Sequence, residues 1–330
     1  MTFAVRTAQG KDDMDFFFKL GFETLKTLRE SYYNRLLEDN PGKSDDELLL
    51  AYRKENEDYC DFNSPETRVF IAEAKDRVRC GYLWTGKRNS RDPWDLQEPQ
   101  WIYDIVVVPA FQGQGLGKKL MAKAEEFAIE RNRNIGLFVH ADNSRALALY
   151  ERTGYLVRVV PISRKLDAEE SESGLIEEFL IEKEEESERG LVRESEYQRF
   201  RRKVEFSRHA DDEDVNRLFD EHSSKYIETP EKHLRLIGLT GTGELAGLIW
   251  AGISEFNEKI VSIYELLVDT THKRNELAKI LEHSAGKWAR SLECSALYIL
   301  LHAKDDFDLD FFKSIGYSVP GYFMEKRLID

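Results

Sequence analysis

Residues 101–120 read WIYDIVVVPAFQGQGLGKKL, and this stretch decides the fold. Its first eight residues are apolar, aromatic or β-branched with one exception, which predicts a strand that ends at Pro109. A glycine loop follows at 112–119, and from Leu116 onward apolar residues recur on one helical face. The stretch therefore predicts a strand, a glycine loop and an amphipathic helix that begins near Gly115, which is an α/β unit.

The glycine loop at 112–119 is suited to an anion. Glycines at a helix start leave the backbone N–H groups uncovered, and these donors together with the helix dipole favour a pyrophosphate. A P-loop does not fit, because Gln112 and Lys119 stand where it needs glycine and Ser or Thr. A dinucleotide fingerprint does not fit either, because the spacing is GxGxG late in its domain. The alternative is a tight turn without a ligand.

A second pattern follows at 138–155, FVHADNSRALALYERTGY. With it, the sequence resembles the GNAT N-acetyltransferase superfamily. The pyrophosphate motif of that family is matched by Gln112, Gly115 and Gly117. Its downstream pattern is matched by Asn143, Ala146, Tyr150, Gly154 and Tyr155. The resemblance covers residues 3–166 well and extends weakly to 204–330.

The chain also contains an internal repeat. Residues 80–84 (CGYLW) are echoed by 246–250 (AGLIW), and 154–166 aligns without a gap with 316–328. We therefore expect a duplicated α/β domain. The predicted boundaries are an N-terminal acetyltransferase domain at 1–166, an acidic helical linker at 167–203 and a degenerate GNAT-like domain at 204–330. Helical spacing predicts the linker helix from Leu175, Ile176, Phe179 and Leu180.

The second copy departs from the family pattern at two positions. Glu276 replaces the central glycine, so charge and bulk oppose an anion there. Phe312 stands where the first copy has Tyr150. The second copy is therefore expected to keep the fold, to lose the chemistry, to pack on the first domain and to wall the acceptor pocket.

The resemblance implies that each domain has a mixed, mostly antiparallel sheet, splayed between its fourth and fifth strands and flanked by helices. In the first domain these strands are 101–108 and 135–140, and acetyl-CoA would lie between them as the acyl donor. Asn143 has a second possible role as a helix N-cap. The residues implied to bind acetyl-CoA are Val106, Val107, Val108, Gln112, Gly113, Gln114, Gly115, Leu116, Gly117, Lys118 and Asn143.

Amine acetylation needs a neutral amine, a polarised carbonyl and a proton donor for the thiolate. Tyr150 stands where the family places that donor, and its alternative role is a core aromatic. Asp104 interrupts an apolar strand and must face the cleft or be paired. It is a candidate base or orienting group, and the alternative is a salt-bridged or capping carboxylate. His140 is a weaker candidate for proton relay.

The remaining features concern the acceptor. Residues 15–62 form a long helical insertion that is a candidate lid, although most of its aromatic residues are expected in the core. We expect an acetyl-CoA-dependent N-acetyltransferase that modifies a primary amine of a small molecule, amino acid or peptide by direct attack on the thioester. The alternative is a non-catalytic acyl-CoA sensor or interaction protein with the same fold.

Composition restricts the other classes of function. Of 330 residues, 48 are Lys or Arg and 62 are Asp or Glu, and the net charge of −14 argues against nucleic-acid binding. Three scattered cysteines indicate neither a disulfide framework nor a metal site, and they are typical of the cytoplasm. No stretch predicts a membrane span. We expect a cytoplasmic monomer or homodimer without a metal.

Overall fold

The computed structural model describes residues 3–89, 98–166, 179–184, 189–207, 210–269, 274–303 and 309–329. We call residues 3–166 the front half and residues 179–329 the rear half. The strands of the front half are β1 (Ala4–Thr7), β2 (Arg68–Glu73), β3 (Arg79–Lys87), β4 (Gln100–Val107), β5 (Ile135–His140) and β6 (Leu156–Lys165). Its helices are α1 (Gly10–Leu28), α2 (Glu30–Asp39), α3 (Asp45–Tyr59), α4 (Leu116–Ile129) and α5 (Ser144–Arg152), with 3-10 turns η1 (Lys75–Arg77) and η2 (Pro109–Phe111).

The rear half repeats this order with fewer helices before its second strand. Its strands are β7 (Phe179–Lys183), β8 (His233–Thr240), β9 (Leu245–Ser254), β10 (Asn257–Val268), β11 (Ala296–His302) and β12 (Gly321–Lys326). Its helices are α6 (Arg189–Ser207), α7 (Asp212–Glu228), α8 (Arg274–Ser291) and α9 (Leu309–Ser314), with the 3-10 turn η3 (Pro230–Lys232). The predicted duplication of a mixed α/β unit is therefore confirmed.

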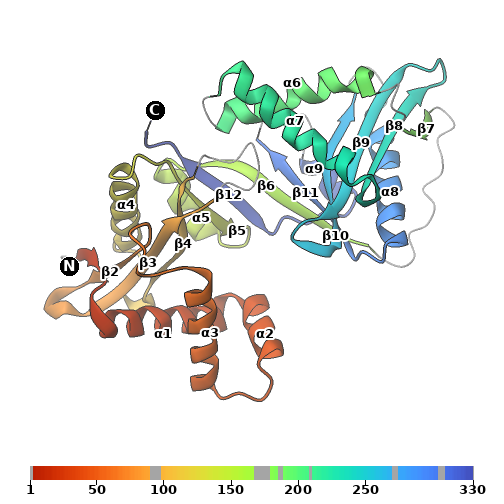
Figure 1. Cartoon of the computed structure of the whole chain (residues 1–330). Helices are drawn as coiled ribbons and strands as arrows, with labels where there is room; N and C mark the ends of the chain where they lie inside the picture. The colour runs from red at the N-terminus through yellow and green to blue at the C-terminus, as the bar shows by residue number, and fades with distance from the viewer. Residues whose placement is uncertain are drawn as a thin grey trace.

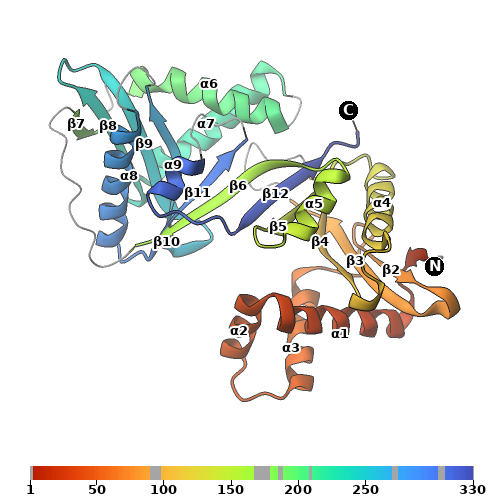
Figure 2. The same cartoon turned by 180° about the vertical axis from the view of Figure 1, so that it is seen from behind.

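All twelve strands form one continuous sheet, in the order β1-β2-β3-β4-β5-β12-β6-β11-β10-β9-β8-β7. The two halves exchange their last strands: β12 of the rear half lies between β5 and β6, while β6 pairs with β11. Figures 1 and 2 show β6 and β12 side by side in the middle of the molecule, with the C-terminus returned to the front half. The halves thus share strands, whereas the sequence predicted two domains that only pack together.

Each exchanged strand completes the core of the other half. Met324 of β12 is fully buried among the side chains of β2 to β5 and α4. Ile162 of β6 is fully buried among those of β9 to β11 and α8. Burial of such a side chain stabilises by roughly 1.5–3 kcal/mol, so each half depends on a residue that the other supplies.

Each exchanged strand also forms an ion pair with a helix of the other half. Arg164 of β6 binds Glu282 of α8 at 2.8 Å, and Lys326 of β12 binds Glu125 of α4 at 2.8 Å. Arg164 and Lys326 occupy equivalent positions in the repeated segments 154–166 and 316–328. The two halves are therefore related by an approximate twofold arrangement around the paired strands β6 and β12.

The predicted linker differs from the structure. Phe179 and Leu180 lie in strand β7, which pairs antiparallel with β8, and not in a helix. Leu175 and Ile176 lie outside the described residues. Apolar residues at the spacing of one helical turn also fit the alternate positions of an edge strand, and the tertiary pairing decides between them. Residues 189–203, which the sequence placed in the linker, begin helix α6.

Helices cover the sheet on both faces (Figures 1 and 2). In the front half, α4 packs on one face and α1 with α3 on the other. The predicted insertion at 15–62 is helical, and its Phe17 and Phe18 are buried against Tyr82 and Trp84 of β3. We call α1, α2 and α3 the front hood, and α6 and α7 the rear hood. Phe200 and Phe219 join the two helices of the rear hood at a ring distance of 5.4 Å.

His222 makes the rear hood sensitive to acid. Its ring is buried between Phe200 and Trp250, and burial, together with nearby Lys203, lowers the pKa of the imidazole to about 3. The unfolded chain binds a proton on this residue near pH 6.5, so stability is lost as the pH falls below that value. We expect the free energy of unfolding to drop by about 2 kcal/mol between pH 7 and pH 5 from this group.

Urea denaturation of the wild type and His222→Gln over that pH range measures the drop. The variant should lose most of the pH slope. Replacement of His233, which is only half-buried, should change the slope less. Identical slopes in the wild type and His222→Gln would contradict the prediction.

Candidate active site

Strands β4 and β5 separate at the place where the sequence predicted a splay. They pair in parallel only at 100–102 with 135–137, and β4 beyond Ile102 has no partner strand on that side among the described residues. The register of β3 against β4 shifts between Trp84 and Thr85, which leaves Tyr103 as an extra, bulged residue. Asp104 follows the bulge and lies at the mouth of the splay.

The carboxylate of Asp104 is paired on both oxygens. Arg29, between α1 and α2, donates from Nη2 to Oδ1 at 2.5 Å. Tyr82 of β3 donates from its hydroxyl to Oδ2 at 2.5 Å, and the Ile105 amide donates to Oδ1 at 2.9 Å. Asp104 is only 7% exposed, so this pairing compensates for its burial. The salt-bridged alternative for Asp104 is thus the arrangement observed.

The tyrosines around Asp104 are held protonated. Burial raises the pKa of Tyr82 and of Tyr52 of α3, and in both cases the Asp104 charge raises it further. Gly21 of α1 makes room for both rings: a Cβ there would lie 2.7 Å from the Tyr52 hydroxyl and 2.9 Å from that of Tyr82. A larger residue at this helix position would therefore force the two phenols to shift.

Tyr150 lies on the other side of the splay, on α5. Its side chain is buried, and burial together with the Asp104 charge raises the pKa of its phenol. Among the described residues its hydroxyl has no hydrogen-bond partner. The Arg29 charge opposes that shift, so the phenol lies within electrostatic range of both Asp104 and Arg29. The phenol is protonated and available to donate.

The glycine loop has the geometry of an anion site. Gly115 is the N-cap of α4 with φ 82° and ψ 5°, and Gly113 has φ 78°. An L side chain is strained at such angles, so glycine is needed for the chain to turn into the helix. Within the part of the chain that the structure describes, no acceptor binds the amides of residues 113–118. The first turn thus presents a run of free donors, and Leu116 and Leu120 anchor it in the core.

The edge of β4 is partly occupied. The Val108 amide donates to the Cys80 carbonyl of β3 at 2.9 Å. Because backbone groups alternate along a strand, those of Val108 and Val106 face β3 and those of Val107 face the splay. The Gln112 side chain donates to the Val107 carbonyl at 2.9 Å. Of the three valines, only Val107 thus presents backbone groups to a ligand in the splay.

Asn143 is the N-cap of α5, and its side chain accepts from the Ala146 amide at 3.1 Å. The N-cap role considered from the sequence is therefore confirmed. Arg145 of the same helix donates to Gln112 Oε1 at 2.5 Å. This bond ties the start of α5 to the glycine loop across the splay.

His140 ends β5 below the front hood. Its ring lies 6.1 Å from Tyr32 of α2 and 5.2 Å from Phe138. Gly321 of β12 pairs with His140, and Phe323 of β12 packs on Phe138 at 5.1 Å. The rear half therefore contributes to this side of the splay through the exchanged strand.

The rear half keeps the splay and the bulge. β10 pairs with β11 only at 260–263, and the register against β9 shifts at Tyr264, so Glu265 is the counterpart of Asp104. Lys203 of α6 binds Glu265 at 3.0 Å, and Arg199 donates to the Leu266 carbonyl at 3.0 Å. This arginine occupies the strand edge that the splay would offer to a ligand.

The departures from the family pattern lie where the sequence alignment placed them. Phe312 of α9 is buried, and its carbonyl accepts from the Tyr317 amide at 3.1 Å. The Tyr150 carbonyl accepts from the Tyr155 amide in the same way, at 3.0 Å. Glu276 lies in the first turn of α8. The rear splay thus has no phenol at the position of Tyr150 and carries a carboxylate at the helix start.

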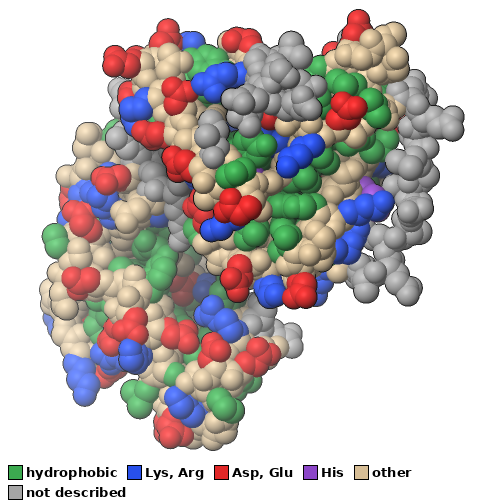
Figure 3. All heavy atoms as spheres, turned by 45° about the vertical axis from the view of Figure 1, so that its right-hand side comes forward, with side chains coloured by type: hydrophobic (Ala, Val, Ile, Leu, Met, Phe, Trp, Pro, Cys, Tyr) green, Lys and Arg blue, Asp and Glu red, His purple; other side chains and the backbone are tan. Residues whose placement is uncertain are grey.

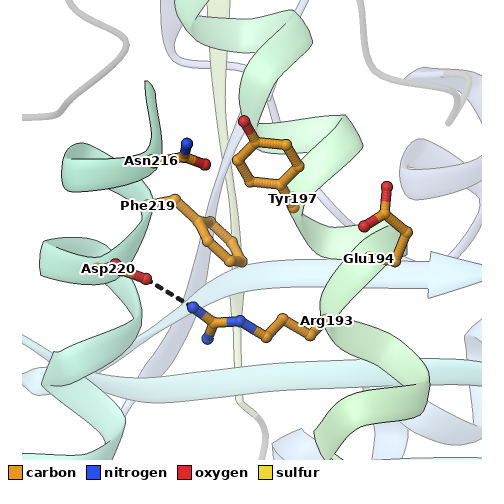
Figure 4. Close-up of a pocket in the computed structure, with 6 residues that line it drawn as sticks. All are labelled: Arg193, Glu194, Tyr197, Asn216, Phe219 and Asp220. Atoms are coloured by element: carbon orange, nitrogen blue, oxygen red, sulfur yellow. Dashed lines mark hydrogen bonds and ion pairs between the residues drawn. The ribbon is translucent and has the colours of Figure 1, made fainter. Parts of the chain in front are cut away.

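Two pockets in the described part of the chain hold none of the predicted site residues. A pocket between α6 and α7 is crossed by the Arg193–Asp220 ion pair, at 2.6 Å, and lined by Tyr197 and Phe219 (Figure 4). A second lies at the start of α1 beside the paired Arg6 and Asp13. Figure 3 shows a hollow where the two halves meet, with hydrophobic side chains on its wall. Among the described residues, no cluster of His, Cys, Asp or Glu is arranged to hold a metal ion.

Sequence reasoning missed Arg29 and Tyr82 as members of the site. Arg29 is 75 residues from Asp104 along the chain and belongs to no motif. For Tyr82 a signal existed, because a phenol within the apolar run 80–84 needs a polar partner when buried. Its pairing with Asp104 depends on the register of β3 against β4, which the sequence does not specify.

The model of the Acetyltransferase (GNAT) family matches twice, at residues 28–155 and 193–317. An uncharacterized N-acetyltransferase of Archaeoglobus fulgidus is 30% identical over 145 residues, which are 42% of this chain and 84% of the relative. A mycothiol acetyltransferase of Kocuria rhizophila is 42% identical over 82 residues, 24% of this chain and 26% of the relative. A GCN5-related N-acetyltransferase from Sphaerobacter thermophilus aligns over 99% of this chain and 96% of its own, with a TM-score of 0.49 and 17% identity.

The helices that the structure describes include none with the length and apolar content to span a bilayer.

Proposed function

Because the chain belongs to the acetyltransferase (GNAT) family, we propose that its front half, completed by β12, transfers the acetyl group of acetyl-CoA to a primary amine. The observation that carries the proposal is the run of free amides at 113–118, directly beside a splay that holds a buried, protonated Tyr150. A pyrophosphate would accept hydrogen bonds from these amides, and the dipole of α4 would attract its negative charge. The acyl end of the ligand would then lie between β4 and β5.

The chemistry that we propose is direct attack. The amine nitrogen forms a bond to the thioester carbonyl carbon, the carbon–sulfur bond breaks, and the thiolate takes the Tyr150 proton. The proton released by the nitrogen passes through water and restores the phenol. The pKa of a free phenol lies only slightly above that of a thiol, and burial raises the pKa of Tyr150 further. The phenol therefore gives up its proton only as the proton from the nitrogen replaces it.

In this proposal Asp104 does not act as the base while Arg29 and Tyr82 bind both of its oxygens. Its predicted role as a base stays a prediction, and one that requires Arg29 to leave. The rear half supports the front site through β12, and we propose no acetyl transfer in its own splay.

Calorimetry with acetyl-CoA tests the proposal. The wild type should bind one equivalent, and Gly115→Glu should weaken binding about 100-fold or more, because a carboxylate and a strained turn replace open amides. A Cβ at Gly115 meets no atom within 4 Å, so the variant should stay folded. Gly42, which also has positive φ and open surroundings, gives the control Gly42→Glu in the front hood.

Equal affinity of Gly115→Glu and the wild type would contradict the proposed cofactor site. Tight binding of acetyl-CoA without thiol release, over a broad panel of amines, would instead support a sensor of acyl-CoA.

A further inference from the structure

Arg29 is held at the splay in an unusual way for a residue that only neutralises a buried charge. It lies in the break between α1 and α2, with φ −136° and ψ 55°, outside both helices. Its side chain reaches down to Asp104, yet 35% of that side chain remains exposed. The Asp104 side of this ion pair is therefore buried, whereas the Arg29 side chain keeps contact with solvent.

The rear half provides an internal comparison. There the equivalent carboxylate, Glu265, is bound by Lys203, whose side chain is 5% exposed, and lies 3.4 Å from Arg199, whose side chain is 8% exposed. Both cations sit within α6 and are closed off from solvent. The half whose splay has lost the phenol therefore has a sealed pair, and the half that has kept it has an open one.

The Arg29 guanidinium has N–H groups that Asp104 does not use. A guanidinium carries five N–H groups in a planar fork that matches a carboxylate. In the described part of the chain, Asp104 is the one hydrogen-bond partner of the Arg29 guanidinium, through Nη2. The second oxygen of Asp104 is fixed by Tyr82, so the guanidinium is held against a rigid anchor.

From this arrangement we propose that Arg29 binds a carboxylate on the acceptor, so that the acceptor is an α-amino acid or a related amine that carries a carboxylate beside the amine. The inference rests on the proposed function. In such a molecule one carbon separates the two groups, so a carboxylate on Arg29 keeps the amine beside the splay, facing Tyr150. Asp104 is then a positioning residue that aims the fork, and Tyr82 and Gly21 keep Asp104 in place.

The net charge of the Arg29–Asp104 pair agrees with these two roles. Asp104 alone would attract any cationic amine, and with Arg29 bound the pair is neutral. A neutral pair whose guanidinium still has unused N–H groups favours a zwitterionic acceptor over a simple cation. The carboxylate of the zwitterion gains charge-assisted hydrogen bonds that a lone amine lacks.

The test compares the common α-amino acids with their amides as acceptors, in the full-length protein saturated with acetyl-CoA. We expect kcat/KM to be at least tenfold higher for an accepted amino acid than for its amide. Arg29→Gln should lower this ratio at least tenfold, and Arg29→Lys, which keeps the charge but loses the fork, should give an intermediate ratio. The basicity of each amine is the same for every variant, so its effect cancels when the ratio of one variant is compared with that of another. Arg53→Gln is the matched control, because Arg53 of α3 is equally exposed and is also paired, with Asp15 of α1 and Glu57 of α3.

A second readout does not require turnover. Calorimetry of the CoA-loaded protein should show tighter binding of N-acetyl amino acids than of their amides, and Arg29→Gln should abolish the difference. A structural role of Arg29 would lower stability and leave both ratios unchanged, which overturns the inference. Carboxylate-selective binding without any acetyl transfer would support the inference and count against the proposed function.

Discussion

Tyr150→Phe is expected to lower kcat by about 100- to 10,000-fold, the range that a lost general acid produces, with acetyl-CoA affinity unchanged. The variant removes one oxygen that the described residues leave without a hydrogen-bond partner, so the fold loses little. Without the phenol the thiolate must leave unprotonated or wait for water. Thiol release in the steady state gives kcat, and calorimetry gives the affinity.

Tyr155→Phe is the matched control. Its ring is also buried, 6.0 Å from that of Tyr150, and it faces the Lys326 side of the core. We expect that variant to keep kcat within a few-fold of the wild type. Comparable losses in both variants would mean that the phenols only fill the core.

The pH dependence of the rate gives a second test of Tyr150 as the acid. An acid must be protonated, so its contribution is lost as the pH rises through its pKa. Burial raises the pKa of Tyr150 above the ordinary value near 10, so no descending limb from this residue is expected below pH 10. The acceptor amine must be neutral, and kcat/KM should therefore rise with pH toward the pKa of the amine.

Removal of β12 is expected to unfold the front half. A chain that ends at residue 320 loses six paired positions beside β5, the buried Met324 and the Lys326–Glu125 ion pair. It also exposes the edge of β5 that faces away from β4. We expect loss of acetyl-CoA binding and of hydrogen-exchange protection in β4, β5 and α4, although residues 321–330 lie far from the front half in sequence.

Two further variants separate packing from length. Met324→Ala should cost about 2–5 kcal/mol in the free energy of unfolding of the front half. A peptide of residues 316–330, added to the truncated chain, should restore acetyl-CoA binding in part. If residues 1–166 alone fold and bind acetyl-CoA as the full chain does, the exchanged strand is dispensable and the prediction is wrong.

Local patterns were enough to predict much of the fold. The strand, glycine loop and helix from 101 to 129 depend on contiguous residues, and the structure has them at Gln100–Val107 and Leu116–Ile129. The splay, the repeat and the N-cap at Asn143 were also predicted. Each follows from short-range preferences or from a family pattern within one segment.

The strand exchange was not predictable in this way. The segments 154–166 and 316–328 are alike, so either could pair with β5, and their sequences do not state which one does. The pairing of Arg29 with Asp104 was missed for a related reason, because a buried carboxylate demands a partner without saying where in the chain it lies. Strand β7 was read as helix because its pairing partner, β8, is more than fifty residues away.

Because of the strand exchange, neither copy can be deleted without removing a strand from the other. The rear copy lacks the phenol and the glycine loop, yet its final strand completes the core of the front half. Two separate, identical chains with this topology would cross their last strands in the same manner and form a symmetric pair. In its topology the present molecule is thus equivalent to a dimer whose two subunits are fused and differ in sequence.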